Sequence, residues 1–296
     1  MRAPTICVVG SVNLDLVATS SRLPRPGETV TGAEFARHPG GKGANQALAA
    51  RRRDAVVTLI AAVGDDTLAD EALELLRSED VDLSRLVTVP DSPTGVALIA
   101  VDAVGENQII VAPGANRRLR PEEVHAAGFD VVLCQLEVPD DAVVAAAEQA
   151  TGLFCINAAP ARPLPARVVD RADVIIVNEI EHEELAEPLG DFEGLLVVTL
   201  GASGAEAFRQ GERVAGADSP AVDAVDAVGA GDSFCGSLVV ELASGAPLPD
   251  ALARACAAGA AAATRRGAQP SLPTTEDVTA LLGRSGGVQE QEGRDR

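Results

Sequence analysis

The chain has 296 residues, of which 47% are hydrophobic and 23% charged, enough for one large domain with a substantial core. A formal net charge of −20 argues against nucleic acid or an anionic membrane as a partner. Trp and Tyr are absent and only six Phe are present, so aromatic platforms for stacking bases are excluded. A nucleotide can still bind between aliphatic groups.

The chain contains no apolar run of the roughly 18 residues that a membrane helix requires. The first residues lead directly into a strand-like run at 6–9, so we expect no signal peptide. The five cysteines are widely spaced among apolar neighbours, which is typical of reduced core residues in the cytoplasm. The three histidines do not cluster, which argues against a structural zinc site.

Apolar runs alternate with helical patterns along the chain, which predicts a largely parallel sheet covered by helices. The predicted strands cover residues 6–9, 56–62, 131–133, 153–156, 174–177 and 195–200. The predicted helices cover residues 44–52, 68–79, 140–150, 231–243, 250–264 and 276–282. The segments 16–35 and 95–112 instead alternate apolar and polar residues and carry turn signals, so we expect antiparallel strands of a small additional sheet.

A glycine-rich run at residues 226–234 (DAVGAGDSF) precedes an apolar helical stretch. If a helix begins near Gly231, the backbone amides at its positive end suit a phosphate or a developing oxyanion. Asp232 would lie beside that anion, where a carboxylate can act as general base toward a hydroxyl. The alternative is an ordinary loop in which Asp232 caps the helix.

A second glycine-rich run, residues 39–46 (PGGKGANQ), opens the helix at 44–52. Lys42 lies in the first turn, and Asn45 follows on the same side three residues later. Backbone N–H groups, an ammonium and an amide could together bind a polar ligand. The glycine spacing excludes a Walker A loop, and a helix start with a solvated Lys42 is the alternative.

Polar side chains follow four or five predicted strands at the point where each strand ends. In open α/β sheets ligands bind beyond the carboxyl ends of the strands, so these positions predict a cleft rather than isolated turns. The polar residues are Asn13, Asp15, Gln135, Glu137, Asn178, Glu181, Thr199 and Ser203, and Gly201, Ala202 and Gly204 belong to the same run after the last strand.

These motifs, in this order, resemble the ribokinase-like (phosphofructokinase-B type) carbohydrate kinases over nearly the whole chain. The matching runs are residues 10–15 (GSVNLD), 26–30 (PGETV), 40–46 (GGKGANQ), 64–66 (GDD), 94–99 (TGVALI), 114–116 (GAN), 135–137 (QLE), 159–162 (APAR), 178–179 (NE), 199–201 (TLG), 226–234 (DAVGAGDSF) and 267–271 (GAQPS). The resemblance implies an α/β fold, a three-layer α/β/α sandwich with a largely parallel central sheet and a small β-sheet lid. It implies one domain over residues 1–282, with lid strands at about 12–36 and 94–113, followed by a disordered tail at 283–296.

The resemblance also implies an activity, the ATP-dependent phosphorylation of D-ribose at O5. Asp232 matches the catalytic base, and the amides of Gly229, Ala230 and Gly231 match an anion hole. Ribose-contacting positions are matched by Asn13, Asp15, Gly41, Lys42, Asn45, Glu137 and Asp232. Nucleotide-binding positions are matched by Asn178, Thr199, Gly201, Ala202, Ser203, Gly204, Gly231 and Cys256.

The resemblance further implies Mg²⁺ bound with ATP near Glu181, and K⁺ or a similar monovalent cation as activator. The cation site is matched by Asp226, Val228, Ala262, Arg265, Gly267 and Ser271, mostly through backbone carbonyls. A homodimer through the lid is implied as well. A kinase for deoxyribose or a nucleoside in the same family is the closest enzymatic alternative. The chain is also shorter than the family pattern between Asn178 and Thr199, so a catalytically impaired sugar-binding relative is a further alternative.

Overall fold

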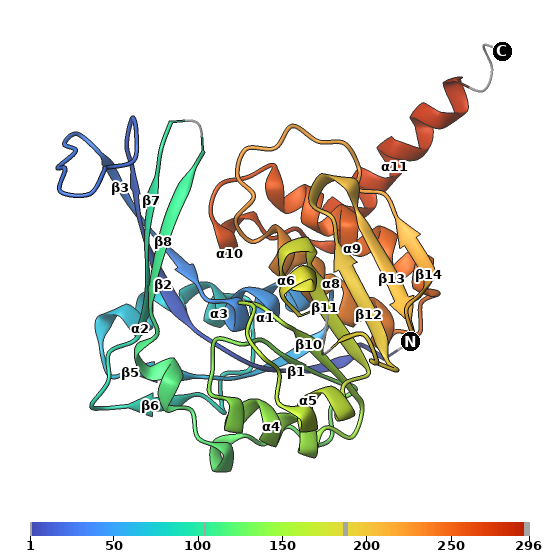
Figure 1. Cartoon of the computed structure of the whole chain (residues 1–296), viewed down its shortest axis with the longest axis horizontal. Coiled ribbons are helices and arrows are strands. Elements are labelled where there is room, and N and C mark those ends of the chain that lie inside the picture. The colour runs from blue at the N-terminus through green and yellow to red at the C-terminus, as the bar shows by residue number, and fades with distance from the viewer. Residues whose placement is uncertain (1, 104, 186–188, 293–296) are drawn as a thin grey trace.

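The computed structural model describes residues 2–103, 105–185 and 189–292, with side chains up to residue 284. Within these residues, eight strands form the central sheet in the order β14-β13-β12-β11-β10-β9-β1-β4 (Figure 1). Six of them run parallel: β1 (Thr5–Val9), β4 (Val56–Ile60), β9 (Val131–Cys134), β10 (Leu153–Asn157), β11 (Val174–Asn178) and β12 (Leu195–Thr199). The strands β13 (Ala205–Arg209) and β14 (Glu212–Ala217) extend one edge in antiparallel orientation.

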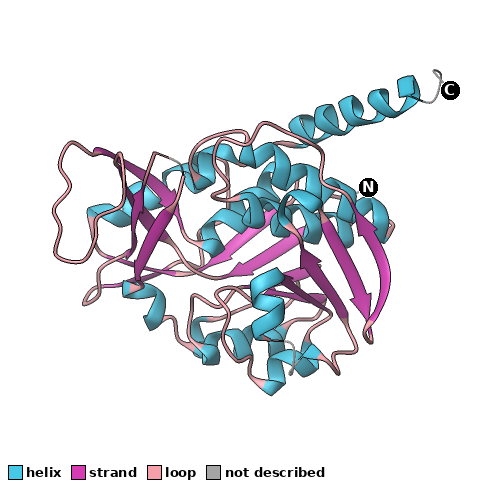
Figure 2. Ribbon diagram, turned by 45° about the horizontal axis from the view of Figure 1, so that its top comes forward, coloured by secondary structure: helices cyan, strands magenta, loops and turns pink. Residues whose placement is uncertain are grey.

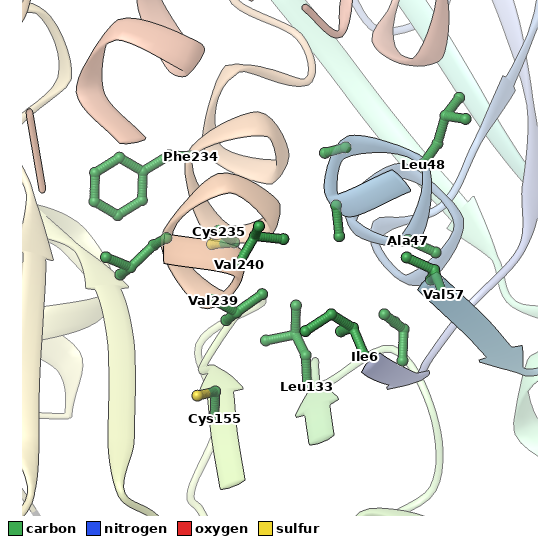
Figure 3. Packing of buried hydrophobic residues seen from close by; sticks show 14 of the residues in the cluster. Ile6, Ala47, Leu48, Val57, Leu133, Cys155, Phe234, Cys235, Val239 and Val240 are labelled. Atoms are coloured by element: carbon green, nitrogen blue, oxygen red, sulfur yellow. The ribbon is translucent and has the colours of Figure 1, made fainter. Parts of the chain in front are cut away.

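Both faces of the central sheet are buried, which explains why its strands read as unbroken apolar runs. Along β1, Ile6 and Val8 belong to the hydrophobic cluster on one face, and Cys7 and Val9 belong to the cluster on the other. Figure 3 shows the first cluster, where Ile6 and other strand side chains pack below those of two helices. The alternation of strand side chains therefore fills two cores at once.

Helices cover each face of this sheet, as Figures 1 and 2 show. The first cluster lies under α1 (Lys42–Arg52), α8 (Ala230–Ala243) and α9 (Leu248–Ala263), and the second lies over α4 (Asp140–Gln149) and α5 (Ala166–Arg171). The remaining helices are α2 (Thr67–Ala72), α3 (Glu74–Ser78), α6 (Glu179–Glu184), α10 (Ala268–Ser271) and α11 (Thr275–Glu292). The predicted three-layer α/β/α sandwich is confirmed.

A four-stranded second sheet, the lid, stands at one end of the molecule (Figure 1). It has the order β3-β2-β7-β8, formed by β2 (Asn13–Thr19), β3 (Glu34–Gly40), β7 (Gly95–Val101) and β8 (Asn107–Ala112). The pairs β2–β3 and β7–β8 are antiparallel, but β2 and β7 pair in parallel. That central pair differs from the antiparallel expectation, because the two hairpins come from separate insertions that enter the lid in the same direction.

Several elements were not predicted from the apolar runs of the sequence. These are β13 and β14, which are rich in alanine and charged residues, the short helices α5 and α6, and a two-stranded sheet of β5 (Ala62–Gly64) and β6 (Val87–Val89). Three 3₁₀ turns complete the chain: η1 (Gly114–Arg118), η2 (Pro121–Glu123) and η3 (Gly201–Ser203).

The tail at residues 283–296 was expected to be disordered, but α11 continues as a helix through residues 283–292. The helix begins at Thr275 and is anchored by the buried Val278, and its later residues extend an element already nucleated there. Residues 293–296, and residues 186–188 of the shortened region, lie outside the described residues. Every helix that the structure describes is too short or too polar to cross a lipid bilayer.

Candidate active site

The helix α1 approaches the end of β1 so closely that only glycine fits at two positions. A Cβ on Gly43 would lie 2.4 Å from the amide nitrogen of Ser11, and a Cβ on Gly41 would lie 2.7 Å from that of Asn13. Gly41 also has a φ of 89°, which favours glycine. The glycines of this motif therefore seat α1 directly on the β1–β2 connection.

The helix α8 meets α1 through a third close approach. A Cβ on Gly236 would lie 2.6 Å from the Cβ of Ala49 and 2.8 Å from the carbonyl oxygen of Gln46. Asp232 lies one turn before Gly236, in the first turn of α8, and Gly229 caps that helix with a φ of 82°. The tight helix pair therefore places the Asp232 carboxylate against α1.

Both oxygens of the Asp232 carboxylate accept hydrogen bonds from α1. Asn45 Nδ2 donates to Oδ2 at 2.9 Å, and Gln46 Nε2 donates to Oδ1 at 2.8 Å. Gln46 Nε2 also donates to Asn157 Oδ1 at 3.0 Å, and Gln135 Nε2 donates to Gln46 Oε1 at 2.6 Å. All five side chains are buried, so Asp232 is held by a dense amide network.

A cavity of about 220 Å³ opens beside Asp232 at the carboxyl ends of β10, β11 and β12. It is lined by Lys42, Asn157, Ala159, Ile176, Val177, Asn178, Glu181, Thr199, Ala227, Gly229, Gly231, Asp232 and Cys235. Burial opposes the charge of Lys42, but the nearby carboxylates, led by Asp232 and Glu137, outweigh it and raise the pKa of the ammonium. The cavity therefore combines the Lys42 ammonium, the hydrogen-bonded Asp232 carboxylate and the N-terminus of α8. This arrangement can stabilise the negative charge of an anionic group while it is transferred.

The lid side of the site contains a second carboxylate, Asp15 on β2. Burial, with the nearby carboxylates of Glu137 and Asp232, raises the pKa of Asp15 to about 7. Glu137 accepts the hydroxyl of Ser11 and, at 3.1 Å, the backbone N–H of Lys42. Of the predicted substrate residues, Glu137 therefore lies within electrostatic reach of both Asp15 and Lys42.

Asn13 is oriented by a residue for which no role was predicted. Asn116 in η1 accepts the N–H of Val12 at 2.9 Å and donates to the Val12 carbonyl at 3.1 Å, and its Nδ2 also donates to Asn13 Oδ1 at 2.8 Å. Because the backbone pair fixes the Asn116 amide, Asn13 must present its own NH₂ group elsewhere.

The predicted nucleotide residues fall into two groups. Asn178, Thr199 and Gly231 line the cavity, and Asn178 and Glu181 form a reciprocal cap of α6, with bonds of 2.9 and 2.8 Å to each other's backbone N–H. Burial raises the pKa of Glu181. Gly201, Ala202 and Ser203 form the exposed η3 turn beyond β12 and lead to Gly204. Cys256 lies in α9 instead, where its Sγ is 3.7 Å from the Ala217 carbonyl.

The predicted cation residues lie on two segments of the chain, which Asp226 joins. Its carboxylate accepts the N–H groups of Val228 at 3.0 Å and Gly267 at 2.9 Å. The Arg265 side chain points to Asp277, with N–O distances of 3.1–3.2 Å, so only its backbone can face this junction. Among the residues that the structure describes, no group of three His, Cys, Asp or Glu side chains could hold a metal ion.

Three buried residues of the site received no role from the sequence, namely Ser11, Gln46 and Asn157, and the buried Gln135 was predicted only as one of the polar strand ends of the cleft. A signal existed for Gln46, because it lies four residues after Lys42 and so shares its helix face with Lys42 and Asn45. Asn157 directly ends a buried strand, as Asn178 does. Their partners, however, come from distant parts of the chain and could not be derived from spacing.

A doubly covered parallel sheet with a glycine-capped carboxylate at its carboxyl edge defines an α/β phosphotransferase, and the comparisons agree. Residues 3–275 match the pfkB family of carbohydrate kinases, and the chain belongs to that family. It is 36% identical to a ribokinase of Bacillus subtilis, over 94% of this chain and 99% of the relative.

Two solved structures support the same assignment. A ribokinase of Thermotoga maritima superposes with a TM-score of 0.87 at 31% identity, covering 95% of this chain and 99% of the other. A ribokinase of Arabidopsis thaliana, solved with ribose and ATP, gives a TM-score of 0.84 at 28% identity with the same coverage. The chain is therefore a kinase that transfers a phosphoryl group to a hydroxyl acceptor.

Proposed function

We propose that the protein phosphorylates D-ribose at O5, using ATP as the phosphoryl donor. The observation that carries the proposal is the convergence of Lys42 and the held Asp232 on one cavity at the N-terminus of α8. The ribokinases of Bacillus subtilis and Arabidopsis thaliana, the latter solved with ribose and ATP, support the choice of sugar and nucleotide.

Asp232 acts as the general base in this proposal. As the sugar O5 forms its bond to the γ-phosphorus and the bond to the ADP oxygen breaks, the O5 proton passes to an Asp232 carboxylate oxygen. Each carboxylate oxygen accepts one amide bond and keeps a second acceptor site for that proton. The amides of Gly229, Ala230 and Gly231 would receive charge developing on the phosphoryl group, and the Ala230 N–H now donates to the Ala227 carbonyl at 3.2 Å.

The sugar would lie between the lid and α1. Asn45 Oδ1 is buried and has no hydrogen-bond partner among the described residues, so it can accept a sugar hydroxyl. Asn13, Asp15, Gly41 and Glu137 would supply the other contacts. A closed lid excludes water, which would otherwise compete with the sugar as phosphoryl acceptor.

Two metal sites belong to this proposal. Mg²⁺ with ATP would neutralise phosphate charge, and the donors that fit it are the oxygens of the cavity-lining Glu181 and of Asn178. A monovalent cation would be held beside the Asp226 carboxylate, which joins the segments of Val228 and Gly267, with neutral oxygens of Val228, Ala262, Arg265, Gly267 and Ser271 as its other ligands. Such an ion would stiffen the loop that precedes Gly229.

A homodimer formed through the lid is also proposed. Phe35, Leu98 and Ile110 are exposed, and the strand register places all three on one face of the lid. A second lid would cover this apolar face. The five cysteines are all buried and unpaired, which supports action in a reducing compartment, the cytoplasm.

The decisive experiment is a coupled ADP-release assay with Mg-ATP and ribose, 2-deoxyribose, fructose or adenosine, each with and without K⁺. We expect fast turnover with ribose that K⁺ increases. Preference for 2-deoxyribose or adenosine would overturn the choice of sugar. Ribose binding without turnover would support the impaired, sugar-binding alternative. Measuring the molar mass of the protein and of the Ile110→Glu variant tests the dimer.

A further inference from the structure

We propose that Gln46 is a positioning residue that fixes the Asp232 carboxylate for catalysis, and that Gln135 fixes Gln46 in turn. The proposal rests on the base role of Asp232 proposed above. Its basis is the chain of buried hydrogen bonds from Gln135 Nε2 to Gln46 Oε1 (2.6 Å) and from Gln46 Nε2 to Asp232 Oδ1 (2.8 Å).

The orientation of both amides follows from the carboxylate. An ionised Asp232 can only accept, so Gln46 must turn its NH₂ group toward it and its carbonyl oxygen away. That oxygen then needs a donor, which is the NH₂ group of Gln135. Gln135 Oε1 is left buried without a hydrogen-bond partner in the described part of the chain, packed where a Cβ on Gly10 would lie 2.1 Å away. This series of hydrogen bonds thus leaves the Gln135 oxygen unpaired among the described residues, two hydrogen bonds away from Asp232, and keeps a donor on the Asp232 carboxylate itself.

The anchor points of Gln46 all belong to the main body of the molecule. Gln135 follows β9 directly, and Asn157 Oδ1, which accepts the second N–H of Gln46, ends β10. Asn157 is itself fixed by a bond of 3.2 Å from its Nδ2 to the Ile176 carbonyl. The plane of the Asp232 carboxylate is therefore set by the central sheet and does not depend on the lid.

Asn45 and Gln46 are adjacent and both donate to Asp232, but they have different roles. No described residue bonds to Asn45 Oδ1, so this oxygen can contact the sugar. Both polar atoms of the Gln46 side chain are already bonded, and the residue is fully buried, so it has no group left for a substrate. Loss of Gln46 should therefore affect turnover and spare substrate binding.

The first test is Gln46→Met, which removes the donor and keeps the volume. We expect kcat to fall about 10- to 100-fold while KM for ribose stays within about threefold, because a misplaced base slows the transfer step and not binding. A matched control is Gln149→Met, at the end of α4 on the opposite face of the sheet, which loses the bonds of Gln149 to the Val124 carbonyl and the Ala126 N–H. Its kcat should equal that of the parent.

The second test is Gln46→Glu, which is nearly isosteric and keeps the proposal testable if the Met variant folds poorly. Two carboxylates at hydrogen-bond distance share a proton, so the acid limb of the kcat–pH profile should move up by more than about one pH unit. A purely structural role would leave the profile in place. An unchanged profile with parental kcat would overturn the proposal.

The link to Gln135 is tested by a double-mutant cycle. Gln135→Met should lower kcat several-fold, because Gln46 can then turn its oxygen toward Asp232. The double variant should be no slower than Gln46→Met alone, since Gln135 acts only through Gln46. Fully multiplicative losses would contradict the relay.

Asp232→Asn separates this proposal from the one on which it rests. If Asp232→Asn retains normal turnover, the base assignment itself fails. If Asp232→Asn is inactive but Gln46→Met and Gln46→Glu keep parental kcat and pH profile, the base assignment stands and the positioning role of Gln46 is overturned. Thermal unfolding and ribose titration calorimetry on every variant confirm that the protein is folded.

Discussion

Two carboxylates face the same site from different bodies of the molecule, and they are held in opposite ways. Asp232, on a helix packed against the central sheet, has an amide donor on each oxygen. Asp15, on the lid strand β2, is equally buried, but no hydrogen bond to its carboxylate exists among the described residues. The Asp232 carboxylate is therefore oriented before any substrate binds, whereas no described residue donates a hydrogen bond to the buried Asp15 carboxylate.

The difference matches the tasks that the two carboxylates would have. A base must be oriented in advance, because reorganisation at the moment of proton transfer raises the barrier. A substrate-binding carboxylate gains selectivity if only the correct hydroxyls satisfy it, since a buried acceptor without donors is costly. Burial, followed by repulsion from Glu137 and Asp232, raises the pKa of Asp15 to about 7, and no hydrogen-bond donor among the described residues offsets these effects.

The largest effect on turnover is expected from substitution of Asp232, the carboxylate that is oriented in advance. Asp232→Asn removes the proton acceptor but can keep one amide bond of the network, so we expect kcat to fall by about 10²–10⁴ with the fold and ribose binding retained. Coupled ADP release measures turnover, and calorimetry measures binding. A variant that binds ribose and turns over at a parental rate would show that another group takes the proton.

Substitution of Asp15 tests the binding of ribose rather than the rate of turnover. Sugar hydroxyls bind the ionised carboxylate best, so with a pKa of about 7 the ionised fraction, and the affinity for ribose, should rise about tenfold between pH 6 and 8. Asp15→Asn should raise KM for ribose about 10- to 100-fold at pH 8 and remove this pH dependence. A KM that is flat with pH in the parent would contradict the assignment.

The same substitution has a stability signature of predictable sign. A pKa raised in the folded state means that the Asp15 contribution to stability is fully present below about pH 4 and lost as the pH rises through about 7. Asp15→Asn should therefore be more stable than the parent at pH 8, by roughly 2–4 kcal/mol, and the gain should shrink at pH 5. Urea unfolding at the two pH values measures it.

Gly236 tests whether close helix packing prepares Asp232. A Cβ at this position would lie 2.8 Å from the Gln46 carbonyl oxygen, so Gly236→Ala should push α8 away from α1. We expect a loss of about 1–3 kcal/mol in the free energy of unfolding and about tenfold in kcat. Gly283→Ala is the control, because a Cβ there meets nothing within 4 Å. Equal turnover in both variants would separate packing from catalysis.

The two carboxylates also mark what the sequence could and could not reveal. The parallel strands were predictable because both faces are buried and the runs are uninterrupted, and the position of Asp232 in the first turn of a helix was predictable from its glycines. The edge strands β13 and β14 were not, because alanine and charged residues give them no apolar signal. The amide network around Asp232 joins residues 89 to 187 positions apart, and such contacts exist only once the sheet has folded.

The smallest effect is expected at Asn116, which would sharpen the contrast on the lid side. Asn116→Ala frees Asn13 Oδ1 and lets the Asn13 amide rotate, so KM for ribose should rise several-fold while kcat is nearly unchanged. The Val12 N–H and carbonyl also lose their partner, which should cost about 1–3 kcal/mol of stability. The kinetic pattern is the reverse of that expected for Gln46→Met, where kcat falls and KM holds. If Asn116→Ala instead lowered kcat as strongly as Gln46→Met does, residues on the lid side would also control turnover. The distinction between Asp232 as a base oriented in advance and Asp15 as a substrate-binding carboxylate would then not hold.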